Sequence, residues 1–466
     1  MPNKLASRFI IATGALLVVA AGAALTLIGR PPELLRVGAN YGAKIVCSSV
    51  FIAHRDPQAV LADDVQAPGH PLLQYLQVRV DRSSKTVHAD FLGILGKGLA
   101  VYRPGTGCAA VPDGDVAQAA QFQYTPLKIW APSPNVPWPT GSMADTDAAV
   151  QALLDNDMLA GPGVRGMAVI HRGRLVAQRY GRGFGTTTPL LGWSMTKTVN
   201  AALVGIQIAQ GNLAPERKGF WPEHGDPRAQ VTLSQLLSMT SGLQFNEAYG
   251  DVSDVTRMLY LEPDMAAYAA AQPQVHAPGT VWRYSSGSAV LLSRIWQRAA
   301  VAAGSPPAAA TSVAVLPMPR DRLFAPIGMS SAIIEADARG NLVGSSYMYA
   351  TTQDWARFGQ FLLQDGVWQG KRILPEGFVA MMQQPVAASG GQYGQGQVWR
   401  QGPSSGANAD GPYKLPADTY WMQGHDGQSI AIVPSRELVV VRLGLTPRAL
   451  EYRPQALLAA VIGQLP

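Results

Sequence analysis

The sequence predicts an α+β fold in which an antiparallel sheet is assembled from both ends of a large domain. Near the start of that domain, residues 167–171 and 175–180 alternate like the two strands of a hairpin. The strand-like segments near its end are 420–423, 428–433 and 438–443. More than 200 residues of mostly helical pattern separate the two groups, and a helical pattern at 454–465 follows. This segregation favours an antiparallel sheet flanked by helices, with a helical insertion, over an alternating βαβ fold.

Composition excludes several classes of protein. Of 466 residues, 47% are hydrophobic and 15% are charged, so the chain can bury a large core and is not disordered throughout. The net charge of +6 is spread without any Lys/Arg run, so no nucleic-acid partner is expected. The chain has no His-Glu-x-x-His motif, no Cys/His cluster and no glycine-rich phosphate loop after a strand. Neither a metal nor another cofactor is therefore expected.

The amino terminus predicts a membrane helix. Lys4 and Arg8 precede an uncharged stretch, 9–29, which ends at Arg30. At 1.5 Å per residue this stretch would span about 31 Å, roughly the thickness of a bilayer core. The small residues 21–24 could instead serve a signal peptidase, so a cleaved signal stays an alternative to a retained anchor. In either case the positive flank stays inside, and we expect the rest of the chain on the periplasmic side of a bacterial-type inner membrane.

Three segments follow from these patterns. Residues 1–30 form the anchor or signal, and 31–125 form a small accessory segment with strand-like stretches at 76–80 and 86–91. Residues 126–466, which open on a proline-rich stretch, form the main domain.

Two cysteines, Cys47 and Cys108, are the only ones in the chain, and both lie in the accessory segment. An oxidising compartment would allow a disulfide between them. Two unpaired buried thiols are the alternative.

Ser194 and Lys197, in the run Ser194-Met195-Thr196-Lys197, are the first candidates for chemistry. A serine and a lysine three residues apart share one face of a helical turn. If the serine opens a helix, its oxygen gains from the helix dipole and the lysine amine can reach it. A lysine whose pKa is lowered by burial can take the serine proton. The bare spacing is common by chance, so an ordinary surface serine and lysine is the alternative.

Two further segments carry candidate residues. Tyr284, in 283–287, could share the base role, because a nearby lysinium would lower the pKa of its phenol. Alone, such a tyrosine is more often a packed aromatic side chain. In 424–428, Gly427 would let backbone approach a substrate closely, and the N–H that follows could stabilise an oxyanion. His425 and Asp426 suggest a triad, but neighbours along a strand point to opposite faces, so we expect only one of them at the site.

The three segments, in this order, resemble the class C β-lactamase and penicillin-recognising serine hydrolase superfamily. The resemblance covers roughly 125–466 and includes the run VTLSQLLSMTSGL at 231–243, which is similar to a segment common in these enzymes. It is closest to the branch of 6-aminohexanoate-dimer hydrolase and related carboxylesterases. It implies a β-lactamase-like fold.

The resemblance implies a role for each matching residue. Ser194 matches the nucleophile, Lys197 the lysine that orients and helps deprotonate it, and Tyr284 the general base that returns the proton to the leaving group. The backbone N–H groups of Ser194 and Gln428 match the oxyanion hole. Tyr249 is similar to a loop tyrosine that closes over substrate amides, although plain packing is the alternative.

Two departures from the β-lactamases bear on the substrate. Ser286 stands where β-lactamases carry Asn, as it does in the aminohexanoate branch. His425-Asp426-Gly427 stands where they carry Lys-Thr-Gly or Lys-Ser-Gly, so the lysine that favours a substrate carboxylate is missing. A carboxylate at Asp426 would also repel an anionic substrate.

The sequence therefore predicts an exported serine hydrolase that cleaves a small carboxylic ester or linear amide through an acyl-enzyme on Ser194. A D-alanyl peptidase or weak β-lactamase is the alternative among enzymes. A penicillin-binding-like envelope module without turnover is the alternative among non-enzymes. The presence of Ser194, Lys197 and Tyr284 together favours the enzyme.

Overall fold

The computed structural model describes residues 28–128, 131–221, 225–302, 313–403 and 408–465, together with Thr13 and Thr26. The predicted membrane helix at 9–29 lies almost entirely outside these residues. Within the part of the chain that is described, no helix is long and apolar enough to cross a bilayer.

A five-stranded antiparallel sheet forms the centre of the main domain, in the order β12-β13-β14-β5-β6. Its strands are β5 (Val164–His171), β6 (Arg174–Tyr180), β12 (Tyr420–Gly424), β13 (Gln428–Val433) and β14 (Leu438–Gly444). The two predicted strand groups meet where β14 pairs with β5, with Val440 opposite Val169. The α+β prediction is thereby confirmed, and the two ends of the domain share one sheet.

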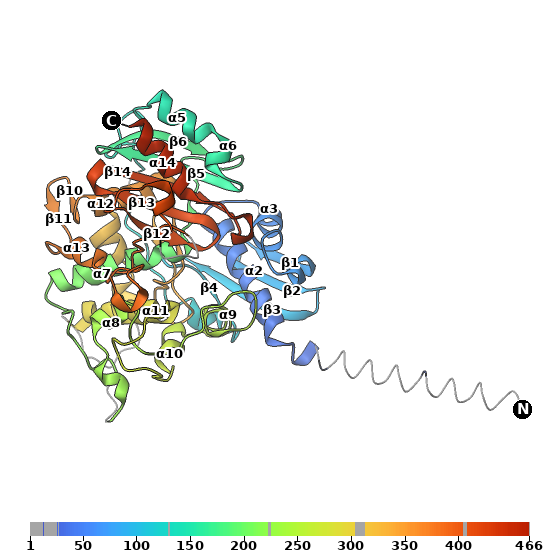
Figure 1. Ribbon diagram of the computed structural model, residues 1–466. Helices are drawn as coiled ribbons and strands as arrows, with labels where there is room; N and C mark the ends of the chain where they lie inside the picture. Colours follow the sequence, from blue (N-terminus) through green and yellow to red (C-terminus); the bar gives the residue numbers. More distant parts are fainter. Residues whose placement is uncertain are drawn as a thin grey trace, which may run out of the picture.

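Helices cover both faces of this sheet. Alternate residues of β14 point to opposite sides, so Leu438 and Val440 join one core cluster and Val439 and Val441 join the other. The first face is covered by α5 (Ala148–Asp155), α6 (Asp157–Ala160) and α14 (Pro454–Gln464), at the top of Figure 1. The second face is covered by α12 (Thr352–Leu363). A Cβ on Gly359 of α12 would lie 2.6 Å from Val439, so only glycine allows this helix to approach so closely.

The predicted helical insertion lies beside the second face. Its helices are α7 (Thr196–Ala209), α8 (Leu233–Leu237), α9 (Asp254–Leu261), α10 (Met265–Ala270), α11 (Ser286–Ala302) and α13 (Phe378–Gln383). The family-like run at 231–243 begins α8, where Thr232 and Gln235 form a capping box. Two small sheets complete the domain. One has three strands, β7 (Leu190–Leu191), β8 (Ile333–Ile334) and β9 (Met348–Ala350), and the other has two, β10 (Val367–Trp368) and β11 (Lys371–Arg372).

The accessory segment folds as a helix laid across a four-stranded sheet. The helix is α2 (Glu33–Phe51), followed by the short α3 (Pro57–Val60), and α4 (Val116–Ala119) closes the segment. The strands, in the sheet order β1-β2-β3-β4, are β1 (Leu76–Asp81), β2 (Thr86–Phe91), β3 (Leu95–Arg103) and β4 (Gly107–Ala110). A Cβ on Gly98 would lie 2.3 Å from the Ala39 backbone, which explains a glycine inside a strand. Cys47 of α2 and Cys108 of β4 form a disulfide, with their Cα atoms 6.1 Å apart.

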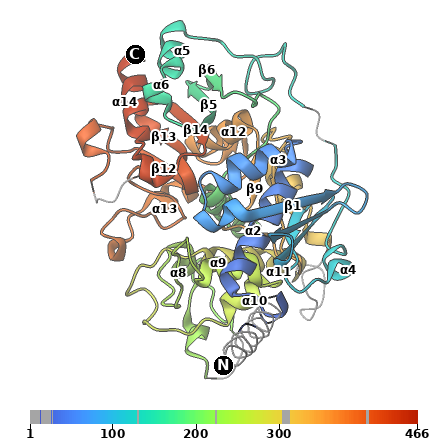
Figure 2. The same ribbon diagram turned by 90° about the vertical axis from the view of Figure 1, so that its right-hand side faces the viewer.

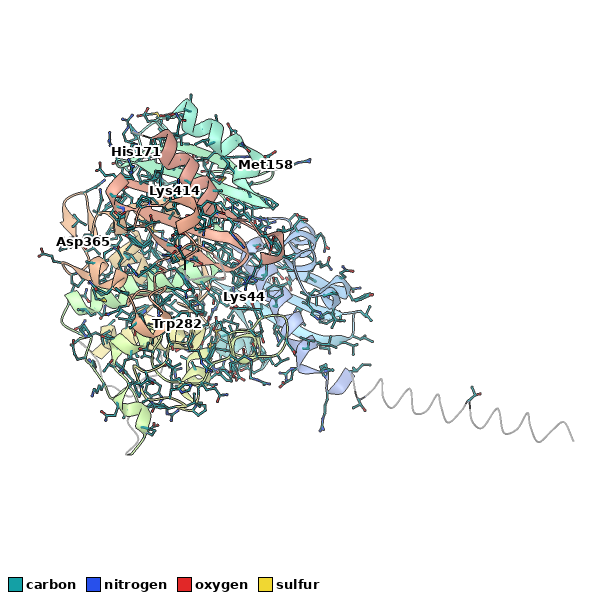
Figure 3. The ribbon with its side chains drawn as sticks, viewed as in Figure 1. Lys44, Met158, His171, Trp282, Asp365 and Lys414 are labelled. Carbon is teal, nitrogen blue, oxygen red and sulfur yellow. A yellow bond between two sulfur atoms is a disulfide. The ribbon has the colours of Figure 1, made fainter. Side chains whose placement is uncertain are left out.

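The accessory unit lies beside the main domain (Figure 1), and buried polar contacts hold the two together. The ammonium group of Lys44, which Figure 3 labels, pairs with the Glu335 carboxylate, and both side chains are excluded from water. Arg103 donates hydrogen bonds to the carbonyls of Ala336 and Asp337. Each of these contacts joins a residue of the accessory unit to a residue of the main domain, so the two pack as one fold.

Candidate active site

Ser194 lies in a tight turn that leads directly into α7. The turn, Trp193–Met195, is a 3-10 helix, and α7 begins at the next residue. Trp193 has φ of +48°, a left-handed conformation that is rare for a bulky residue and marks local strain. A Cβ on Gly192 would lie 2.2 Å from the Trp355 ring, so the turn requires glycine there. This turn places Ser194 at the N-terminal, positive end of the 14-residue helix α7.

Lys197 is buried one turn further along and contacts the nucleophile. Its Nζ lies 3.1 Å from Ser194 Oγ, 3.0 Å from Ser286 Oγ and 3.0 Å from the carbonyl oxygen of Ser345. Burial lowers the pKa of Lys197 to about 8, although the Glu247 carboxylate opposes this shift. A substantial fraction of this lysine is therefore neutral slightly above pH 7, as a general base requires.

Tyr284 completes the cluster. Lys197 Nζ lies 4.7 Å from the centroid of the Tyr284 ring. Burial and the Glu247 charge raise the pKa of Tyr284 well above its usual value, against a smaller opposing effect of the Ser194 hydroxyl. The expectation of a lowered tyrosine pKa is therefore wrong for this structure, because desolvation outweighs the nearby lysine. Tyr284 is a neutral phenol at pH 7.

Glu247 is a site residue that the sequence did not single out. Its carboxylate accepts hydrogen bonds from the Ser286 backbone N–H, at 2.8 Å, and from the Ser286 hydroxyl. Ser286 thus links Lys197 to a carboxylate at the start of α11. Glu247 lies two residues before Tyr249, so it stood in a segment already under consideration, but nothing in the sequence pairs it with Ser286.

His425 and Asp426 lie in the hairpin turn between β12 and β13. Asp426 has φ of +56°, so the chain reverses there. The expectation that these two side chains diverge is wrong, because it assumed a strand. His425 Nε2 lies 3.4 Å from the Asp426 carboxylate. The His425 ring also packs against Tyr249, with centroids 5.1 Å apart, and edge-on against Trp193, at 5.7 Å.

Gln428 begins β13, and its side chain holds the same turn together. Its Oε1 accepts a hydrogen bond from Gly444 N–H at 2.9 Å, and its Nε2 donates to the carbonyls of His425 and Gly444. The edge strand β12 packs on the Ser194 turn, since a Cβ on Gly424 would lie 2.2 Å from the Gly192 carbonyl oxygen. Gly427, with φ of +85°, supplies the turn conformation. The assignment of the Gln428 N–H to an oxyanion hole stays a prediction.

Aromatic residues surround Tyr284 on its other side. The rings of Tyr393 and Trp399 lie 6.0 and 5.4 Å from it, and the ring of Trp282, which Figure 3 labels, lies 6.5 Å away. These residues come from segments about 110 positions apart, so no local motif predicts the cluster. They keep water from the phenol and account for its burial.

Among the described residues, no three His, Cys, Asp or Glu side chains are grouped so that they could hold a metal ion.

A serine, a buried lysine and a tyrosine converge at a helix N-terminus beside the edge of an antiparallel sheet. This arrangement defines the site of a serine hydrolase of the β-lactamase type. Residues 147–460 match the family model described as Beta-lactamase, and since they make up more than half of the chain, it belongs to that family. The resemblance found in the sequence is thereby confirmed.

Solved structures share the fold at low identity. A protein from Bacillus anthracis described as a 6-aminohexanoate-dimer hydrolase is 17% identical, with a TM-score of 0.56 over 90% of this chain and 99% of that one. A protein from Bacteroides dorei DSM 17855 described as a beta-lactamase is 19% identical, with a TM-score of 0.52 over 68% and 98%. A penicillin-binding protein homologue from Caulobacter crescentus is 18% identical, with a TM-score of 0.51 over 68% and 97%. No curated protein sequence matches the chain significantly.

Proposed function

We propose that the protein hydrolyses a carboxylic ester or a linear amide through an acyl-enzyme on Ser194. The observation that carries this proposal is the contact of Lys197 Nζ with Ser194 Oγ at 3.1 Å, together with the lowered pKa of that lysine, about 8. A neutral lysine in this place can accept the serine proton as Oγ bonds to the substrate carbonyl carbon.

The same groups complete the reaction. The oxyanion that forms would be held by the Ser194 N–H, at the start of α7, and by the predicted N–H of Gln428. The neutral phenol of Tyr284 donates its proton to the departing alcohol or amine, and the Lys197 ammonium restores that proton. Water then attacks the acyl-enzyme while Lys197 and Tyr284 act in reverse. The proton that leaves Ser194 in acylation ends on the departing alcohol or amine, and Ser194 Oγ receives a proton from the attacking water when the acid product leaves.

The third motif supports an ester or linear amide over a β-lactam. It offers His425 and Asp426 in place of a lysine, and Asp426 would repel a substrate carboxylate. The fold neighbour described as a 6-aminohexanoate-dimer hydrolase is consistent with a linear amide substrate.

Covalent labelling and a substrate panel test the proposal. A fluorophosphonate should label the wild-type protein and a Ser84→Ala control, whose serine lies in an exposed turn, but not Ser194→Ala. The wild-type protein should also hydrolyse short p-nitrophenyl esters faster than a chromogenic cephalosporin. Faster cephalosporin hydrolysis would favour the peptidase or β-lactamase alternative. Absence of both labelling and turnover would favour a binding module.

We further propose that residues 9–29 anchor the protein and place the catalytic domain outside the cytoplasm. The disulfide between Cys47 and Cys108 supports an oxidising compartment. Carbonate-washed membranes should retain the full chain, and a variant that starts at residue 31 behind a cleavable signal should be released. Release of the full chain from washed membranes would contradict the anchor.

A further inference from the structure

A cavity of about 340 Å³ lies where the accessory unit meets the main domain, next to the candidate active site. In Figure 2, α2 lies beside α9, and residues of both helices line the cavity. Its volume falls within the range of small-molecule pockets, about 300–1,000 Å³. Its lining does not include Ser194, Lys197 or Tyr284, so the cavity is a second part of the site, separate from the catalytic cluster.

Three aromatic rings connect the cavity to the nucleophile. Trp193, Tyr249 and His425 all line it, and they pack on one another. Trp193 precedes Ser194 in the chain, and Tyr249 lies two residues after Glu247 of the catalytic cluster. The cavity therefore begins at the residue that precedes the nucleophile.

The far wall of the cavity is apolar and comes from the accessory unit. It consists of side chains from α2, from the segment before β1 and from β2: Leu34, Leu35, Leu72, Leu73 and Phe91. The charged residues that line the cavity, Asp251 and Asp426, are acidic, so a carboxylate on the ligand would be repelled. An uncharged hydrocarbon chain matches this wall best.

We propose that this cavity is a substrate subsite that binds an uncharged alkyl or acyl chain attached to the scissile carbonyl group. This proposal rests on the proposed function. The accessory unit then contributes directly to substrate selection. Each methylene that enters the cavity should raise kcat/KM about threefold to fourfold, the increment expected for burying one CH₂. The increase should stop when the cavity is full.

Two variants of the apolar wall test the subsite with p-nitrophenyl esters of increasing acyl length. Leu35→Gln places an amide in the cavity and should flatten the dependence of kcat/KM on chain length. Leu72→Trp narrows the cavity and should make the increase stop at a shorter chain. Leu72 is 38% exposed, so its replacement should not unfold the protein. Leu127→Gln is the matched control, since Leu127 is 72% exposed and lies outside the cavity, and it should keep the wild-type dependence.

Binding to Ser194→Ala separates this proposal from the proposed function. Calorimetry of that variant with the same esters should show affinity rising with chain length, and Leu35→Gln in that background should abolish the rise. If affinity rises but the wild-type protein neither turns over nor labels, the subsite stands and the proposed function fails. If the wild-type protein turns over short esters while neither affinity nor kcat/KM depends on chain length, the subsite is overturned. An equal chain-length dependence in the wild-type protein and both wall variants also overturns it.

Discussion

Lys197 and Glu247 are joined through a single hydroxyl group. The Lys197 Nζ lies 3.0 Å from Ser286 Oγ, and that hydroxyl donates its own hydrogen bond to the Glu247 carboxylate. Burial lowers the pKa of Lys197, the carboxylate opposes that shift, and the resulting pKa is about 8. Glu247 therefore sets how far the lysine is deprotonated at neutral pH, although it does not touch Ser194.

The first prediction concerns the pH dependence of the wild-type protein. Lys197 must be neutral to accept the Ser194 proton, and the neutral fraction grows as pH rises toward its pKa of about 8. Well below pH 8, kcat/KM should therefore rise about tenfold per pH unit, and it should level off above pH 8. Initial rates with a p-nitrophenyl ester from about pH 5.5 to about pH 9 measure the profile. A profile that is flat across this range would contradict a lysine base.

Replacing Glu247 by Gln should move that profile to lower pH. The amide keeps the shape of the side chain but removes the charge that raises the pKa of Lys197. A lower lysine pKa means that the neutral form appears at lower pH, so the midpoint of kcat/KM should fall. Glu216→Gln is the control, because Glu216 is an exposed carboxylate outside the cluster, and it should leave the midpoint unchanged. An upward shift, or no shift, in Glu247→Gln would refute this positioning role.

Lys197→Ala and Tyr284→Phe should each lower kcat by about 10²–10⁴, the usual effect of losing a positioned acid–base group. The double variant should lose little more than the worse single variant, since the two groups handle one proton as a unit. Steady-state kinetics of the three variants provide the measurement. Additive losses would show that lysine and tyrosine serve independent steps.

Much of the sheet could be predicted because its signals are local. The prediction of 428–433 agrees with β13, since apolar residues there end at a proline turn and glycine precedes them. β3 was not predicted, because Gly96 and Gly98 interrupt its pattern. Gly98 is there to admit the α2 backbone, a tertiary reason that no local rule contains.

In the candidate site, too, local contacts could be predicted from the sequence and long-range contacts could not. Ser194 and Lys197 share one helical turn, so their spacing alone brings them together. Ser286 and Glu247 are 39 residues apart, and their contact depends on how α11 packs against the preceding loop. The pKa of Tyr284 depends on burial, which the sequence does not specify, so its direction could not be predicted from a nearby lysine.

His425→Ala should alter substrate binding more than turnover. His425 packs between Trp193 and Tyr249 at the boundary of the apolar cavity, and no hydrogen bond of the catalytic cluster involves its ring in the described residues. Loss of these ring contacts should raise KM about threefold to tenfold while kcat changes little. A loss of kcat as large as that of Tyr284→Phe would favour a Ser–His mechanism and contradict the role given to Tyr284.

Glu335→Ala should destabilise the fold through the joint between the two units. The Glu335 carboxylate pairs with Lys44 and accepts hydrogen bonds from Ser48 and from the Cys108 N–H, at 2.8 and 2.7 Å. Removing it leaves a lysine charge without its partner in the interior, which typically costs about 3–5 kcal/mol. The free energy of unfolding in denaturant measures this loss.

Two matched variants make the Glu335 result specific. Asp145→Ala removes an exposed ion pair with Arg174, and it should cost less than about 1 kcal/mol. Replacing both members of the buried pair, by Lys44→Met with Glu335→Leu, should recover much of the stability, because no unpaired charge remains inside. If Glu335→Ala cost no more than Asp145→Ala, the buried pair would not hold the accessory unit in place. The cavity wall that this unit supplies would then depend on the disulfide and the packing of α2.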